Sequence, residues 1–161
     1  MGICDFFRDV LHVPEGEALD AIVAAAELKR LKKGELLIRE GEQQSKVFFL
    51  VKGILRGYFF DANGREITDC FGVQSGTPAM PANAMDAPSS INIEALEDGE
   101  LLGISIETVN QLLDRYPELW RVYRKLSENS LEYHWEKMAA HQNSAMERYQ
   151  WFLNKYADLI D

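Results

Sequence analysis

The side chains best suited to hold a metal ion are few in this chain and widely separated. The histidines are His12, His134 and His141. A metal centre inside a small β-barrel takes several histidines and a carboxylate, and no histidine lies between positions 12 and 134. His134 and His141 are seven positions apart, so they lie one above the other on a helix without a third ligand nearby. We interpret them as surface or interface histidines, and the sequence predicts no metal site.

The two cysteines, Cys4 and Cys70, do not indicate a redox or nucleophilic centre. An iron–sulfur cluster needs about four thiolates, so only two subunits that share their cysteines could build one. Cys70 falls within an expected strand and belongs to no recognisable catalytic triad. We expect free thiols in a reducing compartment, with one disulfide as the alternative. The sequence does not predict an enzyme.

Residues 72–90 could form a site that binds a small molecule. This stretch, GVQSGTPAMPANAMDAPSS, is rich in small and apolar residues and contains two methionines. It fits a pocket for an uncharged or hydrophobic effector, and equally well a loop whose methionines fill space on the barrel. The residues that would line such a pocket are Thr77, Ala79, Met80, Met85, Ser89 and Ser90.

The charges in this region argue against an anionic ligand. No lysine or arginine lies between Arg65 and Arg115, whereas acidic residues such as Asp69 and Asp86 do. A charge-assisted contact to a phosphate contributes about 1.5–3 kcal/mol, and here it would be missing. Backbone amides at a short helix beginning near residues 77–80 could still hold an anion, but without a cation to neutralise it.

The chain as a whole is acidic. Its 161 residues include 26 aspartates and glutamates against 17 lysines and arginines, which gives a net charge of −9. A phosphate backbone attracts basic surfaces, so the chain is not expected to bind nucleic acid by itself. Its hydrophobic residues, 47% of the total, can build a core, but no apolar run reaches the roughly 18–20 residues that span a membrane. We expect a soluble cytoplasmic domain with no membrane partner.

Hydrophobic periodicity divides the chain into three parts. Residues 14–28 place apolar side chains at helical spacing, and this helix is expected to end by 32–34. From about 28 to 104 the pattern changes to short β-branched and aromatic runs, with hairpin turns at Asn63-Gly64 and Asp98-Gly99. Short strands without intervening helices indicate an antiparallel sandwich or a small barrel.

Helical periodicity returns after Ser105, which is expected to cap a helix that ends near Tyr116. A longer helix is expected over residues 118–143, and it carries two apolar stripes rather than the single stripe of a helix on a monomer surface. The second stripe fits a twin helix across a two-fold axis, with enclosure within its own chain as the alternative. One stripe contains Leu119, Val122, Tyr123, Leu126 and Tyr133, and the other contains Trp120, Leu131, Trp135 and Met138. The dimer-contact candidates among them are Leu119, Tyr123, Leu126, Tyr133, Trp135 and Met138.

Several motifs, in this order and spacing, resemble a known family. They are Gly34, the Glu40-Gly41-Glu42 turn, the Val51-Lys52-Gly53 corner, Gly64 in a hairpin, and the run EALED at 94–98. Together they resemble the cyclic nucleotide-binding domain of the catabolite-activator (Crp/Fnr) family of bacterial transcription regulators. The long helix after Pro117 resembles that family's dimerisation helix, and residues 144–153 resemble the helix that leads into its DNA-binding domain.

The resemblance implies an α+β fold: an antiparallel double-stranded β-helix, that is a jelly-roll-like β-roll, with an N-terminal helix and a long C-terminal dimerisation helix. The β-roll with its flanking helices would occupy residues 1–116, the dimerisation helix 117–143, and the beginning of a linker 144–161. In the family a helix-turn-helix module follows and reads the major groove. We expect the chain to be the sensor part of a longer regulator, with a natural stand-alone version as the alternative.

The same resemblance implies a function. In this family the β-roll holds an effector and the long helices pair two subunits, so that a ligand shifts the DNA-binding modules. We therefore expect an effector-sensing and dimerisation domain that forms a homodimer, takes an unidentified effector and no cofactor, and reaches DNA only through a C-terminal module. The alternative is a ligand-free, stand-alone β-roll scaffold or interaction domain.

Cyclic AMP is not the expected effector. In family members that bind it, the glutamate of a Gly-Glu pair holds the ribose, and the arginine of an Arg-Ser or Arg-Thr pair holds the phosphate. Here Pro78-Ala79 and Ser89-Ser90 fall at those two places. Because both the glutamate and the arginine are missing, the sequence predicts a degenerate cyclic nucleotide site.

Overall fold

The computed structural model describes residues 1–79 and 85–159, and the chain divides into two compact units, Met1–Leu119 and Trp120–Asp161. In the described residues, the strands all belong to the first unit, and the second unit is helical. None of the helices in these ranges is long and apolar enough to cross a membrane.

The first unit begins with helical segments: α1 (Ile3–Asp5), the π-helical η1 (Phe6–Val10) and α2 (Glu17–Ala25). The helix predicted over 14–28 is therefore too long, because its last residues enter strand β1 (Glu27–Leu31). Ala26 already has extended backbone angles, φ −79° and ψ 137°. Only the last residue of β1 is buried, so pairing with another strand, and not an alternating pattern, makes this segment a strand.

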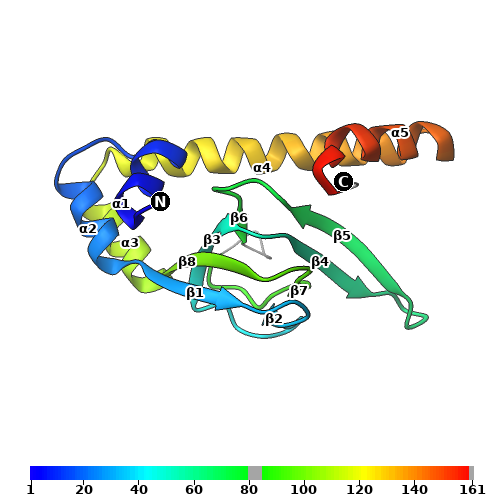
Figure 1. Cartoon of the computed structure of the whole chain (residues 1–161), viewed down its shortest axis with the longest axis horizontal. Coiled ribbons are helices and arrows are strands. Elements are labelled where there is room, and N and C mark those ends of the chain that lie inside the picture. Colours follow the sequence, from blue (N-terminus) through cyan, green and yellow to red (C-terminus); the bar gives the residue numbers. More distant parts are fainter. Residues whose placement is uncertain (80–84, 160–161) are drawn as a thin grey trace. The chain divides into compact units, whose positions relative to one another are not determined.

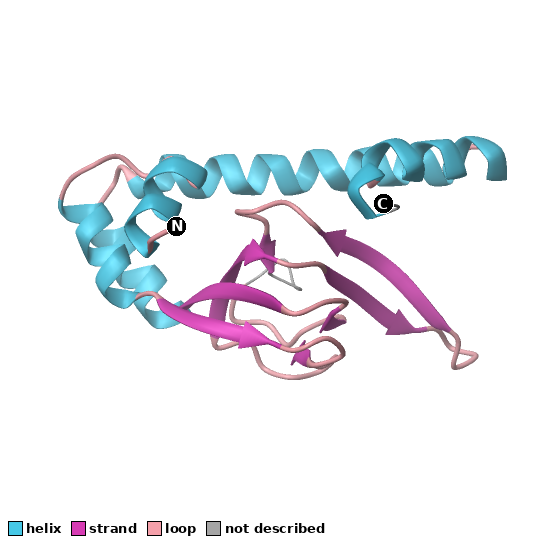
Figure 2. Ribbon diagram, viewed as in Figure 1, coloured by secondary structure: helices cyan, strands magenta, loops and turns pink. Residues whose placement is uncertain are grey.

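The described strands form two four-stranded antiparallel sheets that face each other (Figures 1 and 2). One sheet has the order β1-β8-β3-β6 and the other β2-β7-β4-β5, so the chain crosses repeatedly between them. This is the predicted β-roll. The bounds are β2 (Leu36–Ile38), β3 (Lys46–Lys52), β4 (Leu55–Phe60), β5 (Glu66–Gly72), β6 (Pro78–Ala79), β7 (Asn92–Ala95) and β8 (Gly99–Ser105).

In the β1-β8-β3-β6 sheet the strands β8 and β3 bury side chains on both faces. Between the two sheets lies a core of aliphatic side chains: Leu31, Leu50, Leu55, Ala79, Ile91, Ile93, Ala95 and Leu101. On the opposite face the N-terminal helices and α3 (Ile106–Arg115) cover the sheet, and Phe7 packs edge-on against Phe49 of β3 with ring centres 6.1 Å apart. Each fully buried side chain of this kind contributes roughly 1.5–3 kcal/mol, so the unit has a substantial core of its own.

Two corners of the roll depend on glycine. Gly53, between β3 and β4, has φ 109°, and a β-carbon on it would lie 2.8 Å from the Cα of Gly99. The hairpin between β4 and β5 lies where Asn63-Gly64 predicted it, but its turn is wider than two residues. Only Gly64 of the pair has a positive φ, and the Asp61 carboxylate accepts hydrogen bonds from the N–H groups of Asn63 and Arg65, each at 2.9 Å.

The second unit contains α4 (Leu119–His141), α5 (Ala145–Lys155) and the short 3₁₀ helix η2 (Ala157–Leu159). α4 corresponds closely to the helix predicted over 118–143. Its end is set by Ser144, which caps the next helix by accepting a hydrogen bond from the N–H of Glu147. At the other predicted cap, Ser105 Oγ accepts from the N–H of Thr108 at 3.1 Å, so that expectation is confirmed.

Candidate functional site

The segment at 85–90, which carries three of the predicted pocket residues, is held against the loop between β2 and β3. The N–H of Ser89 donates to the carbonyl of Glu42 at 2.8 Å, and the N–H of Gly41 donates to the carbonyl of Ser89 at 2.7 Å. Two adjacent glutamines also donate to this segment, Gln43 to the carbonyl of Asp86 and Gln44 to the carbonyl of Ala87. The segment is thus fixed through its backbone.

The serine pair that falls at the family's Arg-Ser position has one buried and one exposed member. Ser89 is only 3% exposed, and its hydroxyl donates to the carbonyl of Ile91 while accepting from the N–H of the same residue. Ser90 is exposed, and Met85 is half-buried in a turn. The Ser89 hydroxyl therefore closes a local turn instead of facing an open site.

The other described residues of the predicted pocket, Thr77 and Ala79, lie at or in strand β6 of the first sheet. Ala79 lies in β6, opposite Phe48 of β3, and is part of the core between the sheets. The Thr77 hydroxyl donates to the carbonyl of Gln74 at 2.7 Å, and the Thr77 carbonyl accepts from the N–H of Leu50 at 2.9 Å. The expected short helix near 77–80 is therefore wrong for its described part, because Pro78–Ala79 pairs as a strand. Met80 lies outside the described residues.

Two hollows border these elements. The larger, of about 410 Å³, follows the β2 edge and is lined by residues 34–39 and Glu42. The smaller, of about 130 Å³, has Ala79, Phe48, Gln43 and Gln44 among its walls. Of the described pocket candidates only Ala79 lines either hollow. No sequence pattern singles out the two glutamines, which look like part of a polar turn.

The space between the sheets near β4 is filled by side chains. A β-carbon added at Gly57 would lie 2.7 Å from both the Sγ of Cys70 and the Cδ1 of Ile91. Phe59 and Cys70 pack against the same core. Such close contacts at native packing density leave no room for a ligand beside these residues without movement of the side chains.

Arg56 lies in β4, next to the core residue Leu55 and on the opposite face of the strand. The Arg56 guanidinium contacts the Glu66 carboxylate at 2.8 Å and the Glu94 carboxylate at 2.9 Å, and its Nε donates to the Thr68 hydroxyl at 3.0 Å. It also lies over the Tyr58 ring, 4.6 Å from the ring centre. Two carboxylates and an aromatic face already neutralise this cation.

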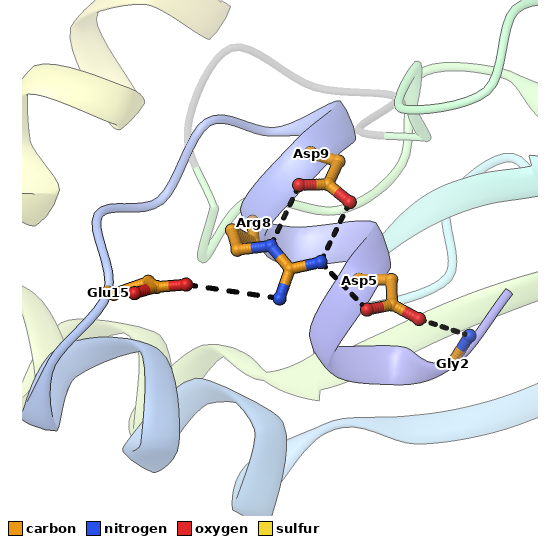
Figure 3. Close-up of polar contacts among 5 residues, drawn as sticks. All are labelled: Gly2, Asp5, Arg8, Asp9 and Glu15. Atoms are coloured by element: carbon orange, nitrogen blue, oxygen red, sulfur yellow. Dashed lines mark hydrogen bonds and ion pairs between the residues drawn. The ribbon is translucent and has the colours of Figure 1, made fainter.

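A second group of charges surrounds Arg8 in the N-terminal helical segment (Figure 3). The Arg8 guanidinium contacts Asp9 at 2.8 Å, Asp5 at 2.9 Å and Glu15 at 4.0 Å. The hydrogen bond from Arg8 lowers the pKa of Asp9, and the Asp9 carboxylate in turn raises the pKa of Arg8 further above its ordinary value. These exposed ion pairs tie η1 to the loop before α2, and they contribute little to stability.

The dimer-contact candidates on α4 differ sharply in exposure. Leu119 is buried, and Tyr123, Leu126 and Tyr133 are half-buried. Trp135 is 63% exposed, and Met138 is exposed as well. Trp120 and Leu131, which belong to the same stripe as Trp135 and Met138, are also exposed, so one of the two predicted stripes is largely open to solvent.

The sequence of this chain matches a known protein family and several of its members. A model of the cyclic nucleotide-binding domain matches residues 28–116. The chain is 27% identical to the Pycsar effector protein XpPycTIR of Xanthomonas perforans over 65% of this chain and 33% of that protein. It is 30% identical to the transcriptional activator protein Anr of Pseudomonas aeruginosa over 72% of this chain and 46% of that protein. It thus spans a third to about half of these curated relatives.

A solved structure agrees in fold. FixK2 from Bradyrhizobium japonicum superposes with a TM-score of 0.71 at 19% identity, over 81% of this chain and 65% of FixK2. The likeness shows the fold of the roll, and the family model covers more than half of the residues. The chain belongs to the cyclic nucleotide-binding domain family, and its similarity to Anr and to the fold of FixK2 agrees with the Crp/Fnr resemblance of its motifs.

Proposed function

We propose that this chain is the effector-sensing and dimerisation domain of a Crp/Fnr-type regulator whose cyclic nucleotide site is degenerate. The observation that carries the proposal is the environment of Ser89. This residue falls where cyclic AMP-binding relatives place an arginine, and here its side chain is buried and hydrogen-bonded to Ile91. A phosphate beside Ser89 would meet no charged side chain from this residue, and the Ser89 hydroxyl is already hydrogen-bonded to Ile91.

Local charge supports the same conclusion. No lysine or arginine lies between Arg65 and Arg115, and Arg56 on the neighbouring strand is already paired with Glu66 and Glu94. To bind a phosphate, Arg56 would have to leave two carboxylates, of which the Glu94 carboxylate is partly shielded from water. An uncharged or hydrophobic effector has no such requirement, and it is the class that we propose for this roll.

The helical unit supplies the proposed dimer contact. Trp120–Asp161 carries equal numbers of acidic and basic residues, so the net charge of −9 belongs to the first unit. Two copies of a neutral surface meet without charge repulsion, and the exposed stripe of α4 offers large apolar side chains to bury. A second copy of the chain is therefore the proposed occupant, with contacts made by Trp135 and Met138.

Each of three segments of the chain has its own role in the proposed function. Residues 1–116 would form the sensor, 117–143 the dimerisation helix, and 144–161 the beginning of a linker. A ligand that favours one packing of the roll would shift the helices, and through them a DNA-binding module that continues the chain. Anr is a transcriptional activator, and this chain is similar to it over 46% of the length of Anr.

A ligand-free scaffold is the second candidate, and the filled interior beside Gly57 favours it. Cys70 and Ile91 occupy the space into which a ligand near β4 would have to fit. In this function the roll would regulate through its helices alone, and no small molecule would stabilise it.

Thermal unfolding with a panel of ligands tests the proposal. A ligand that binds only the folded state raises the unfolding midpoint as its concentration rises. We expect no saturable rise with cyclic AMP or cyclic GMP at millimolar concentration, and a rise with at least one uncharged or hydrophobic compound. A saturable response to a cyclic nucleotide would contradict the degenerate site, whereas no response to any compound would favour the scaffold.

Matched serine variants sharpen this test. Ser89→Ala removes a buried hydroxyl and leaves the Ile91 backbone groups unpaired, which costs about 1–3 kcal/mol of unfolding free energy. Ser90→Ala removes an exposed hydroxyl and serves as the control. If both variants unfold like the unaltered chain, the Ser89 hydroxyl does not close the site.

A further inference from the structure

The smaller hollow, of about 130 Å³, lies on the inner face of the first sheet, where the edge strands β1 and β2 of the two facing sheets meet (Figure 1). Its apolar walls include Phe48 of β3, Ala79 of β6, and Leu37 and Ile38 of β2. All four belong to the core between the sheets or pack against it. Since a cavity of about 150 Å³ accommodates a benzene molecule, this hollow has room for an aliphatic side chain of about four carbon atoms.

Lys29 faces this hollow, although β1 is an edge strand. In the pairing of β1 with β8, Lys29 lies opposite Leu101, which is buried in the core between the sheets. Directly opposite residues of an antiparallel pair project from the same face of a sheet, so the Lys29 side chain leaves the sheet on its inner face. The other lysine of the hollow, Lys46, is paired with Glu27 at 3.1 Å, whereas Lys29 forms no ion pair with any of the described residues.

The rim of the hollow also carries the negative charge of Glu42. The Glu42 carboxylate accepts a hydrogen bond from the N–H of Arg39 at 2.9 Å, and within the described part of the chain it forms no ion pair. The Glu42 carbonyl accepts from the N–H of Ser89 at 2.8 Å, which fixes the backbone of this loop. Lys29 and Glu42 thus border one small hollow with opposite charges, but they do not pair with each other.

A zwitterion with an apolar side chain matches every part of this hollow. Its carboxylate would pair with Lys29, its ammonium group would pair with Glu42, and its side chain would cover the Phe48 ring. A simple carboxylate would bring a second negative charge close to Glu42, and a simple amine would bring a second positive charge close to Lys29. A zwitterion carries no net charge, so it agrees with the uncharged or hydrophobic class of effector proposed above.

We propose that the hollow binds an aliphatic α-amino acid of the size of valine or leucine, and that this amino acid is the effector of the domain. Lys29 and Glu42 select its two charged groups, and the volume of the hollow limits its side chain. Both selecting residues lie outside the segment 72–90, in which the sequence predicts the pocket. This inference rests on the proposed sensor function and names the chemical class of the effector.

Calorimetric titration of the full chain with leucine and its analogues tests the ligand class. Isocaproate lacks the ammonium group of leucine, isoamylamine lacks the carboxylate, and glycine lacks the aliphatic side chain. We expect saturable binding of leucine and a dissociation constant at least about tenfold higher for each analogue, because each leaves one part of the hollow unsatisfied. An analogue that binds as tightly as leucine would overturn the proposal.

Two conservative variants separate the contributions of the charged residues. Lys29→Gln should weaken the binding of leucine at least about tenfold but not that of isoamylamine, which has no carboxylate to lose its partner. Glu42→Gln keeps an oxygen that accepts from the Arg39 N–H, and it should weaken the binding of leucine but not that of isocaproate. Lys32→Gln and Glu40→Gln are the controls, since these residues are exposed and do not line the hollow.

The outcomes distinguish a wrong ligand class from a wrong function. Leucine binding that is unchanged in Lys29→Gln or in Glu42→Gln would overturn the site, once circular dichroism shows that the variants are folded. In thermal unfolding, a midpoint that rises with another uncharged compound but not with leucine refutes the amino acid and leaves the sensor function intact. A midpoint that rises with no compound of the panel refutes both proposals.

Discussion

The β-roll and the helical unit differ in where they place charge and apolar surface. The unit that contains the roll, Met1–Leu119, carries all of the net negative charge, and the roll buries its large aliphatic side chains between two sheets. The helical unit is electrically neutral and leaves large side chains such as Trp120 and Trp135 exposed. The first unit thus has a buried core of its own, whereas the helical unit exposes apolar side chains of a kind that often contact a partner.

The largest expected effect contrasts two leucines, one from each unit. Leu101 in β8 is 0% exposed and Leu131 in α4 is 60% exposed. Leu101→Ala leaves a cavity in the core, so we expect the free energy of unfolding to fall by about 2–5 kcal/mol. Leu131→Ala removes solvent-exposed surface from a helix that tolerates alanine well, and we expect a change below about 0.5 kcal/mol.

Urea unfolding at a protein concentration where light scattering shows monomer gives both values. The monomeric condition matters, since Leu131 would contribute to stability through a dimer if one formed. Similar losses in the two variants would mean that the exposed stripe is already covered within the monomer, and the contrast between the units would disappear.

The next effect concerns association. Placing two charges on the exposed stripe with Trp135→Glu and Met138→Glu should weaken the dimer at least a hundredfold, or about 2.7 kcal/mol, because buried carboxylates would have no partner. Leu126→Glu with Tyr133→Glu, on the other stripe, should leave association intact while it removes the contact between Tyr133 and Tyr156. Light scattering over a concentration series measures both.

The outcomes distinguish the two stripes. Loss of association only in the Leu126 and Tyr133 pair would assign the contact to the half-buried stripe. A monomer at all concentrations for the unaltered chain would contradict the homodimer altogether.

Much of the fold could be predicted from local pattern, where local pattern has a physical cause. The cap at Ser105 and the long helix α4 follow from hydrogen-bonding capacity and helical periodicity. Strand β1 could not be predicted, because only Leu31 at its end is buried and its hydrogen bonds go to β8, more than 60 residues away. The width of the β4–β5 turn depends on the Asp61 side chain, which a pattern of turn residues does not reveal.

The sequence predicts a position for the candidate site but none of its contacts. Counting along the motifs assigns Ser89 to the place where the family has its phosphate-binding arginine. In the structure Ser89 is buried. Its partners Gly41 and Glu42 lie in a distant loop, and Gln44 reaches the same segment from there. Helical periodicity likewise does not predict the contact between Tyr133 and Tyr156. Such pairings arise only when the chain folds and brings distant residues together.

The smallest expected effect concerns the charge of a single carboxylate, that of Asp61 in the turn between β4 and β5. The Asp61 carboxylate accepts backbone hydrogen bonds from Arg65 and Asn63 and contacts the Arg65 side chain at 3.1 Å. These contacts, with the Arg65 N–H first, lower the pKa of Asp61 below its ordinary value. A carboxyl group whose pKa is lower in the folded than in the unfolded chain stabilises the fold above the ordinary value of about 3.9, and that stabilisation is lost as the pH falls through the folded pKa.

Asp61→Asn keeps an oxygen that can accept the backbone hydrogen bonds and removes only the charge. We expect its thermal midpoint to lie slightly below that of the unaltered chain at pH 7, and the two to converge as the pH is lowered past about 3.9. Asp114→Asn, which removes an exposed carboxylate from α3 of the same unit, controls for the change in net charge. A midpoint that rises at pH 7 in Asp61→Asn as it does in the control would mean that repulsion among the acidic residues outweighs the turn contacts. In that case the net charge of the roll, rather than its individual hydrogen bonds, would set its stability.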